Sequence, residues 1–247
     1  MTEQTDTYAL SRRQRGDLTW LEMAPPDATR ETPTLIVLHG LGSAKERMLH
    51  ILYACARQGV RALAPDLVWH GEREGAALRD ARMTEDYFGS LFQVVGGTVE
   101  NIATLLDEYQ LPQAAVHGIS LGGFATFAAL LIEPRLTVGC VALGSPDWLG
   151  LARANGLSES NPMYAAIAQF SPLEQAAKAY PPRPLLLLHG EWDDVVPPQG
   201  SVALYERLQP VYQDNPERLK LVRYPELGHV YTDDMMQRTI AWTKRFL

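Results

Sequence analysis

Length, composition and charge are those of a globular domain, and they exclude several kinds of partner. Of the 247 residues, 46% are hydrophobic and 21% are charged, which is ordinary for a water-soluble protein with a sizeable core. The formal net charge of −7, with no basic run to offset it, opposes binding to nucleic acid or to anionic membranes.

The apolar segments and the cysteines narrow the class of protein further. The longest apolar segments have around nine residues, well short of the roughly 20 that span a bilayer. Residues 1–6 carry neither the basic nor the apolar stretch of a signal peptide. Cys55 and Cys140 lie inside apolar segments without metal-ligand spacing, so we expect two buried free thiols and a cytoplasmic protein that holds no metal.

Apolar runs, their periodicity and the turn residues between them predict alternating strands and helices. In chain order these are a strand at 18–23, a strand at 34–38, a helix at 46–58, a strand at 60–64, a polar loop at 66–84, a helix at 85–109 that Gly96 and Gly97 kink or divide, a strand at 114–116, a helix at 124–132, a strand at 137–143, a small helical cap at about 145–183, a strand at 185–188, a helix at 201–208, a strand at 219–224 and a helix at 232–246.

The strand patterns indicate how these elements assemble. The strand at 18–23 alternates apolar and polar residues, which is typical of an antiparallel edge strand. Later strands such as 34–38 are continuous apolar runs, as in strands buried on both faces. We therefore predict an α/β protein with a mostly parallel, twisted sheet and helices on both faces. The whole chain, 1–247, is expected to form one domain, with the cap as an insertion.

The chain's most distinctive stretch is Gly118-Ile-Ser-Leu-Gly-Gly123, which joins a predicted strand to an apolar helix. Strand, sharp turn and buried helix are the setting of a nucleophile elbow, in which a strained turn projects the serine hydroxyl. A Cβ at position 118 or 122 would crowd such a bend, so glycine fits there. The pattern predicts Ser120 as a nucleophile and the backbone N–H of Leu121 as an oxyanion donor. A glycine-rich turn with an ordinary solvated serine is the alternative.

A serine hydroxyl needs a base within hydrogen-bond reach, and the chain offers six histidines. His39, His117 and His189 each end an apolar strand before a glycine, where packing tethers the ring. His229 instead follows the last predicted strand, in a loop that can swing the imidazole over the sheet edge toward Ser120. We expect His229 to be the base. The alternative is a histidine of a surface loop without a catalytic role.

The base in turn needs an acidic partner that holds its tautomer and stabilises the imidazolium. Asp193 follows the strand at 185–188 and lies between Ser120 and His229 in the chain, which is the Ser…Asp…His order of this strand–turn–helix architecture. Its neighbour Asp194 and the more distant Asp147, which follows the preceding strand, are rivals. We expect Asp193 to be the acid because of its position at the strand end.

A second oxyanion donor is expected from the loop after the strand at 34–38. His39-Gly40-Leu41-Gly42 fits this role, with the backbone N–H of Leu41 as the donor. Such a donor typically contributes around 3 kcal/mol of transition-state stabilisation. The alternative is that the glycines only make the turn, and the two roles are compatible.

With these residues assembled, the chain resembles the α/β-hydrolases, and among them the small bacterial carboxylesterases related to prolyl-oligopeptidase catalytic domains and to dienelactone hydrolases. The resemblance covers about residues 34–247. It is carried by residues 35–40, 64–66, 70–71, 118–123, 186–197 and 228–229. The Gly-x-x-Asp-x-x-Val-Pro stretch at 190–197 supports Asp193 over Asp194. Dienelactone hydrolases carry cysteine where this chain has Ser120, and prolyl oligopeptidases carry a large propeller for which this chain has no room.

The residues and the resemblance together predict a cofactor-free serine hydrolase that cleaves carboxylic esters of small to medium size through an acyl-enzyme. Trp148, Tyr164 and Phe170 in the cap suggest an apolar pocket for the acyl or alcohol part. The same triad would serve a thioesterase, a deacetylase or a small acyl-peptidase. A hydrolase-fold protein that only binds a ligand is the alternative from another class. The expected partner is a small-molecule ester, and the expected assembly is a monomer or a homodimer.

Overall fold

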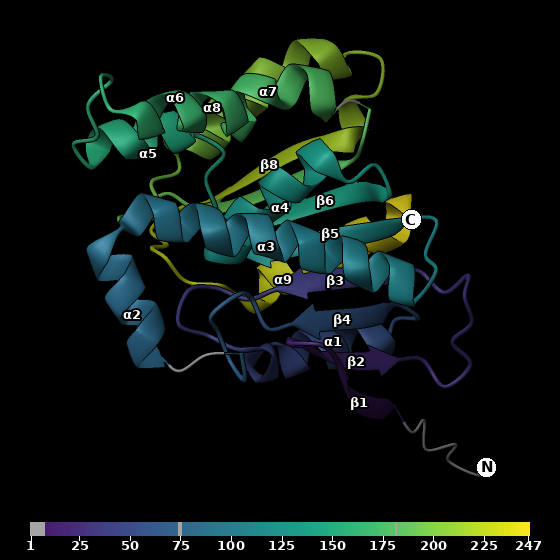
Figure 1. The fold of residues 1–247 in the computed structure, drawn as a ribbon. Helices are drawn as coiled ribbons and strands as arrows, with labels where there is room; N and C mark the ends of the chain where they lie inside the picture. The colour runs from purple at the N-terminus through teal and green to yellow at the C-terminus, as the bar shows by residue number, and fades with distance from the viewer. Residues whose placement is uncertain (1–7, 74–75, 181) are drawn as a thin grey trace.

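A mixed sheet forms the centre of the protein. The computed structural model describes residues 8–73, 76–180 and 182–247. Its strands are β1 (Ala9–Arg15), β2 (Leu18–Ala24), β3 (Thr34–Leu38), β4 (Arg61–Pro65), β5 (Ala114–Ile119), β6 (Leu136–Ala142), β7 (Leu185–Gly190) and β8 (Leu219–Tyr224). They lie in the order β1-β2-β4-β3-β5-β6-β7-β8 (Figure 1). Neighbouring strands from β4 to β8 are parallel, whereas β2 pairs antiparallel with both β1 and β4.

The order in which the chain adds strands to the sheet changes direction beside β3. From β3 the chain moves to β4 on one side, and from β5 it moves to β6 on the other. β3 and β5 are parallel neighbours, and Leu38 pairs with Gly118 near their carboxyl ends. The loops that follow these two strands therefore start next to each other. Such a switch point is where α/β sheets commonly place their functional groups.

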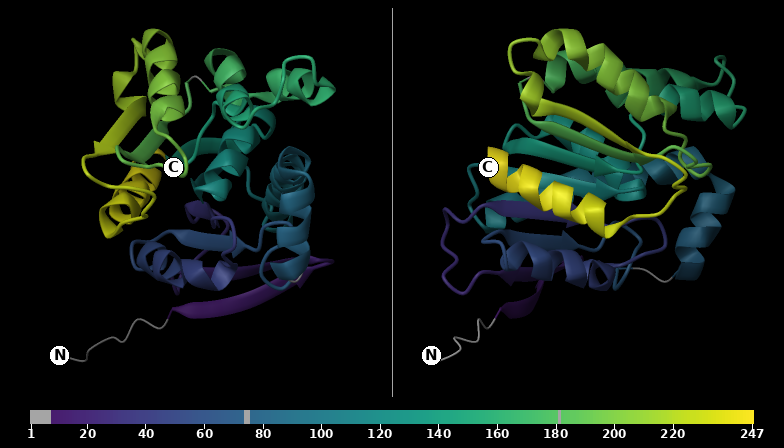
Figure 2. Two further views of the ribbon diagram at one scale, coloured as in Figure 1. Left: turned by 90° about the vertical axis from the view of Figure 1, so that its left-hand side faces the viewer. Right: turned by 180° about the vertical axis from the view of Figure 1, so that it is seen from behind.

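Helices cover both faces of the sheet, each over its own apolar core (Figure 2). One face carries α3 (Tyr87–Glu108), α4 (Leu121–Ile132) and α8 (Gln199–Leu208), and the other carries α1 (Leu49–Ala56) and α9 (Asp233–Phe246). Short 3-10 turns occur at η1 (Lys45–Met48), η2 (Gln209–Tyr212) and η3 (Pro216–Arg218). The predicted α/β class, with a mostly parallel sheet between two helical layers, is confirmed.

The segment between β6 and β7 consists of three short helices, α5 (Trp148–Ala154), α6 (Pro162–Phe170) and α7 (Pro172–Ala179). Side chains cap two of them, because Asp147 accepts a hydrogen bond from the N–H of Gly150 and Asn161 accepts one from the N–H of Met163. α7 packs against α4 and α8, so this segment joins the layer of helices over the first face (Figure 1). These helices occupy the range expected for the cap.

The structure differs from the predicted elements at the N-terminal edge. β2 was predicted as the edge strand, but β1 pairs outside it. β1 has mostly exposed residues and lacks the apolar run on which strand prediction depends. Residues 1–7 lie outside the described part of the chain. The expectation that the chain has no signal peptide rests on this segment.

Two further differences concern helices near the site. The predicted polar loop at 66–84 contains α2 (Ala76–Glu85), whose sequence is rich in good helix formers. α3 runs through Gly96 and Gly97 as one helix, so the predicted division does not occur. A Cβ on Gly97 would lie 2.7 Å from Val68, which indicates that this glycine permits close packing instead of ending the helix.

Candidate active site

Ser120 lies on the sharp turn between β5 and α4. Its φ of 54° and ψ of −115° are strained for a residue with a side chain. A Cβ on Gly118 would overlap the carbonyl group of Gly122, and one on Gly122 would overlap the carbonyl group of Leu38. Only glycine fits at these two positions, so the Gly-x-Ser-x-Gly pattern follows from the close packing of the turn.

The loop after β8 brings His229 to this serine. Nε2 of His229 lies 2.9 Å from Oγ of Ser120, and Nδ1 lies 2.8 Å from Oδ2 of Asp193. The three residues, predicted from separate parts of the sequence, thus form a continuous hydrogen-bonded chain. In this arrangement Nδ1 carries the proton that it donates to the carboxylate, and Nε2 is left to accept the serine proton.

Backbone contacts hold the loop of the acid against the loop of the base. The N–H of Trp192 donates to the carbonyl oxygen of Leu227 over 2.9 Å. A Cβ on Gly190 would overlap the same carbonyl group, so the end of β7 needs a glycine to let the loop after β8 approach. The two loops are thereby fixed relative to each other, and with them the spacing of Asp193 and His229.

Asp193 is buried and both of its carboxylate oxygens accept hydrogen bonds, whereas the two alternative acids, Asp194 and Asp147, have different surroundings. It is 4% exposed, and its Oδ1 accepts the N–H groups of Val195 at 3.1 Å and Val196 at 2.8 Å. Asp194 is exposed. Asp147 accepts the N–H of Gly150 as the cap of α5. Of the three candidate carboxylates, only Asp193 contacts His229 among the described residues.

The loop after β3 lies directly over the serine. A Cβ on Gly40 would be 3.5 Å from Cβ of Ser120, so the loop comes within van der Waals distance of the nucleophile turn. Within the described part of the chain, the backbone N–H groups of Leu41 and Leu121 donate no hydrogen bond. These two groups are the ones predicted to face an oxyanion, and both are free to donate a hydrogen bond to it.

A buried ion pair holds the loop after β3 in place. Lys45 and Asp66 are both fully buried, with Nζ 2.6 Å from Oδ2, and Asp66 also accepts the backbone N–H of Lys45 and of Glu72. Burial by itself would raise the pKa of Asp66, but the hydrogen bonds from Lys45 and the two N–H groups lower the pKa below its usual value. The pair ties the loops after β3 and β4 together. Sequence analysis placed Asp66 only among the segments of the resemblance and missed Lys45, because a lysine near a turn carries no signal of burial.

The histidines at the strand ends are structural. Nδ1 of His39 donates to the carbonyl oxygen of Gly40 at 2.8 Å, and Nε2 accepts the N–H of Leu67 at 3.1 Å. Burial lowers the pKa of His39 to about 4, so the ring is neutral at physiological pH. Both ring nitrogens are occupied, which excludes His39 as a base for Ser120.

A second contact missed by sequence analysis joins the base loop to the strand beneath the serine. The hydroxyl of Tyr231 donates to Nε2 of His117 over 3.0 Å, while Nδ1 of that ring points to the carbonyl oxygen of Cys140 at 3.2 Å. His117 is fully buried, and burial lowers its pKa to about 4. Tyr231 lies two residues after His229, so this bond anchors the loop that carries the base. No sequence spacing links positions 117 and 231.

Ser120 and His229 open onto a cavity of about 290 Å³, referred to below as the site cavity. Its lining is mainly apolar and comes from α2, α3, α4, α5 and the loop after β7, with Met83, Leu91 and Phe124 among its side chains. Trp148, Tyr164 and Phe170, which sequence analysis placed in an apolar substrate pocket, do not line this cavity. The cap residue that does so is Leu151. The site cavity has a mainly apolar lining, but residues other than Trp148, Tyr164 and Phe170 form it.

No group of three or more His, Cys, Asp or Glu side chains in the described part of the chain could hold a metal ion. Across the same residues, no helix is both long enough and apolar enough to cross a membrane.

The mostly parallel sheet between two helical layers, with a serine on a strained strand-to-helix turn at the switch point, defines an α/β-hydrolase of the serine hydrolase class. Residues 102–247 match the model of the prolyl oligopeptidase family. The chain belongs to that family.

Known proteins resemble the chain over nearly its whole length. YitV of Bacillus subtilis (strain 168), a candidate esterase by name, is 28% identical over 88% of this chain and 91% of its own. Esterase YjfP of Escherichia coli (strain K12) is 28% identical over 96% of this chain and 99% of its own. The crystal structure of TT1662 from Thermus thermophilus superposes with a TM-score of 0.78 at 27% identity, covering 97% of this chain and 98% of that one. With these relatives, the chain is a hydrolase of the carboxylesterase type.

Proposed function

We propose that the protein is a serine carboxylesterase in which Ser120 is the nucleophile, His229 the general base and Asp193 the residue that orients the base. The observation that carries this proposal is the hydrogen-bonded chain from Oγ of Ser120 through the imidazole to the carboxylate, with distances of 2.9 and 2.8 Å. The N–H groups of Leu41 and Leu121 form the oxyanion hole.

The reaction proceeds in two steps that share these groups. In the first, the proton of Ser120 passes to Nε2 of His229 while Oγ bonds to the ester carbonyl carbon, and the two N–H donors stabilise the negative oxygen. The carbon–oxygen bond of the ester then breaks, and His229 gives its proton to the leaving alcohol. In the second, His229 takes a proton from water, whose oxygen bonds to the acyl carbon. The bond between that carbon and Oγ of Ser120 then breaks, His229 returns the proton to Oγ, and the acid is released.

The dimensions and lining of the site cavity indicate the kind of ester. Its volume of about 290 Å³ is at the lower end of the ~300–1,000 Å³ common for small-molecule pockets. The side chains around Ser120 are mainly apolar, which favours a short or medium apolar group over a charged one. Esters of small to medium size therefore fit best.

A fluorophosphonate probe tests the proposal because it bonds only to an activated serine. We expect one probe to label each chain of the wild-type protein and none to label Ser120→Ala. In the same variant, kcat for a short p-nitrophenyl ester should fall by about 10⁴–10⁶. Tight binding of an ester without labelling or turnover would overturn the proposal and favour a ligand-binding protein.

The type of bond that is cleaved is tested separately. Rates for a matched ester, thioester and peptide amide with the same acyl group should rank the ester first. A faster thioester would make the protein a thioesterase, and a faster amide would make it an acyl-peptidase, each with the same three residues. The Ser120→Ala variant controls for hydrolysis outside the site in each case.

A further inference from the structure

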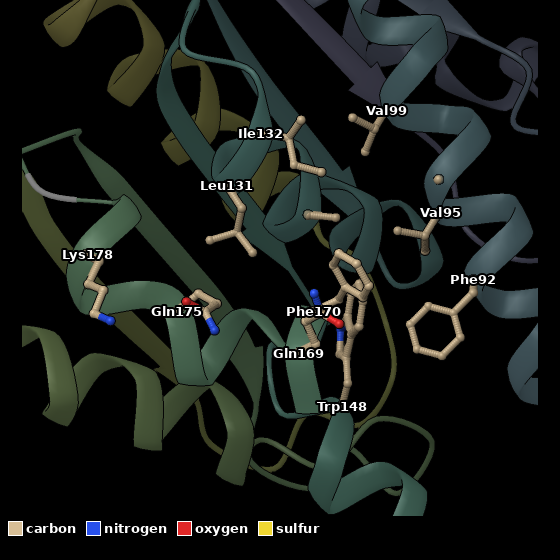
Figure 3. Close-up of a pocket in the computed structure, with 12 residues that line it drawn as sticks. Phe92, Val95, Val99, Leu131, Ile132, Trp148, Gln169, Phe170, Gln175 and Lys178 are labelled. Carbon is tan, nitrogen blue, oxygen red and sulfur yellow. The ribbon is translucent and has the colours of Figure 1, made fainter. Parts of the chain in front are cut away.

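A second cavity, referred to below as the rear cavity, lies between α3, α4 and the cap helices (Figure 3). Its volume of about 620 Å³ is about twice that of the site cavity. Most of its lining is apolar, with Val95 and Val99 from α3, Leu131 and Ile132 from α4, and Phe170 from α6. The mechanism proposed above makes no use of this space.

The two cavities share no lining residue among the described residues, yet their walls lie within one helical turn of each other on three helices. On α3, Leu91 lines the site cavity and Phe92 the rear cavity. On α4, Phe124 lines the first and Ala128 the second. On α5, Leu151 lines the site cavity and Trp148 lines the rear cavity. Since each residue of an α-helix rises 1.5 Å, the residues of each pair lie within about 6 Å of each other along the helix axis.

Two aromatic side chains line the rear cavity at positions next to residues of the site cavity, Phe92 beside Leu91 on α3 and Trp148 one turn before Leu151 on α5. The rings of Phe92 and Trp148 meet edge to face, with centroids 5.4 Å apart, at the end of the rear cavity that adjoins α5 (Figure 3). Trp148 is held in place, since it is 5% exposed and its Nε1 donates to the carbonyl oxygen of Ser145 over 3.2 Å. Phe92 is half-buried and is held by packing alone. Phe92 is therefore the member of the pair that can be truncated without breaking a side-chain hydrogen bond.

We infer that the Phe92–Trp148 pair determines the length of the apolar substrate chain by closing the site cavity off from the rear cavity. This inference rests on the proposed function, because it concerns which esters that site accepts. A chain that outgrows the site cavity meets the two rings and loses affinity. Without the ring of Phe92, the two cavities form one apolar channel, and a longer chain gains the burial that the rear cavity offers.

Hydrolysis of p-nitrophenyl esters from acetyl to hexadecanoyl tests the inference. In the wild-type protein we expect kcat/KM to fall beyond medium-length acyl chains. In Phe92→Ala, the ratio of kcat/KM for the dodecanoyl ester to that for the butyryl ester should rise at least about tenfold, since each buried methylene favours binding by about fourfold. A parallel series of alkyl acetates shows whether the acyl or the alcohol chain occupies the channel.

Filling the rear cavity supplies the matched control. Val99 lines that cavity but not the site cavity, so Val99→Phe alone should leave the wild-type chain-length profile unchanged. In the double variant Phe92→Ala/Val99→Phe, the long-chain gain should be lost again. Urea unfolding of each variant shows whether the protein remains folded. A general loosening of the site by Phe92→Ala would not be reversed by a substitution in the rear cavity.

The outcomes separate this inference from the proposed function. If the wild-type protein hydrolyses butyryl esters and Phe92→Ala shifts neither series, the inference is wrong and the proposed function stands. If the gain appears but Val99→Phe does not reverse it, the chain takes another route, and the inference is also wrong. If no ester is hydrolysed and no fluorophosphonate is bound, the proposed function itself fails.

Discussion

At the scale of single residues, two neighbouring carboxylates have opposite surroundings. Asp193 is buried, accepts two backbone N–H groups and touches His229, whereas Asp194 is exposed. The side chains of adjacent residues in a turn point in different directions, so one position can serve the site and the next the solvent. This difference makes the assignment of the acid directly testable.

We expect Asp193→Asn to lower kcat by about 10⁴, because an amide at this position favours the wrong tautomer of His229. Asp194→Asn is the matched control, with the same chemical change one residue away, and should alter kcat by less than threefold, which corresponds to less than about 0.7 kcal/mol in the activation free energy. Steady-state rates on a short p-nitrophenyl ester provide the measurement. A large loss in Asp194→Asn with little loss in Asp193→Asn would contradict the assignment.

The buried histidines at the strand ends predict how stability depends on pH. Burial lowers the pKa of His39 and of His117 to about 4, from an ordinary value of 6.5. Between these values the unfolded chain binds more protons than the folded chain, so the free energy of unfolding decreases as the pH falls. The contribution is fully present above about pH 6.5 and is lost progressively toward about pH 4.

Urea unfolding should therefore show a lower free energy of unfolding at about pH 5 than at about pH 7, by on the order of 2 kcal/mol for each of the two histidines. His117→Gln should reduce the difference between the two pH values, since it removes one titrating group. His50→Gln changes an exposed histidine and serves as the control. An unchanged pH difference in His117→Gln would show that this ring does not contribute.

At the scale of elements, glycines in two adjacent helices have different roles. Gly122 lies in the first turn of α4, against the backbone of Leu38 at the end of β3. Gly96 lies in the interior of α3, where an added Cβ would meet no atom within 4 Å. The first glycine permits the packing of the nucleophile turn on the sheet, whereas the second only weakens its helix.

Substitution by alanine should separate these two roles. We expect Gly122→Ala to lower the free energy of unfolding by about 3 kcal/mol and to abolish most esterase activity, because the new Cβ displaces the backbone beside Ser120. Gly96→Ala should raise the free energy of unfolding by up to about 1 kcal/mol. Thermal or urea unfolding measures both effects. A Gly122→Ala protein with wild-type stability would contradict the close packing of α4 on β3.

At the scale of the whole molecule, the sheet joins two apolar cores into one structure. Cys55 of α1 and Cys140 of β6 both lie in the core beneath α1 and α9 and are fully buried. Burial raises the pKa of the Cys55 thiol to about 12 and raises that of Cys140 as well. A thiol in this state does not react, because the thiolate is the nucleophile.

A thiol reagent should therefore label neither cysteine in the native protein and both in denaturant. If the chain is one domain, as proposed, labelling and circular dichroism should follow the same urea transition, in a single step. Activity should be lost in that step as well. Labelling of either cysteine under native conditions, or two separate transitions, would contradict a single cooperative unit.

Local patterns were sufficient to predict the class of fold, and they named the three side chains that the structure brings within hydrogen-bond distance of one another. Continuous apolar strands separated by helices indicate a parallel sheet covered on both faces, because such strands have no polar side to expose to water. The steric needs of the turn at Ser120 appear in the sequence as glycines. The chain order of Ser120, Asp193 and His229 follows from strand ends that must meet at one edge of the sheet.

Tertiary structure alone decided the features that depend on contacts between distant segments. The burial of Lys45 with Asp66, the bond between His117 and Tyr231, and the exclusion of Trp148 from the site cavity have no local signature. Each arises because segments far apart in the sequence pack together, and the burial of a side chain depends on what lies opposite it. Periodicity reports which face of an element is apolar, but only packing determines which partner covers that face.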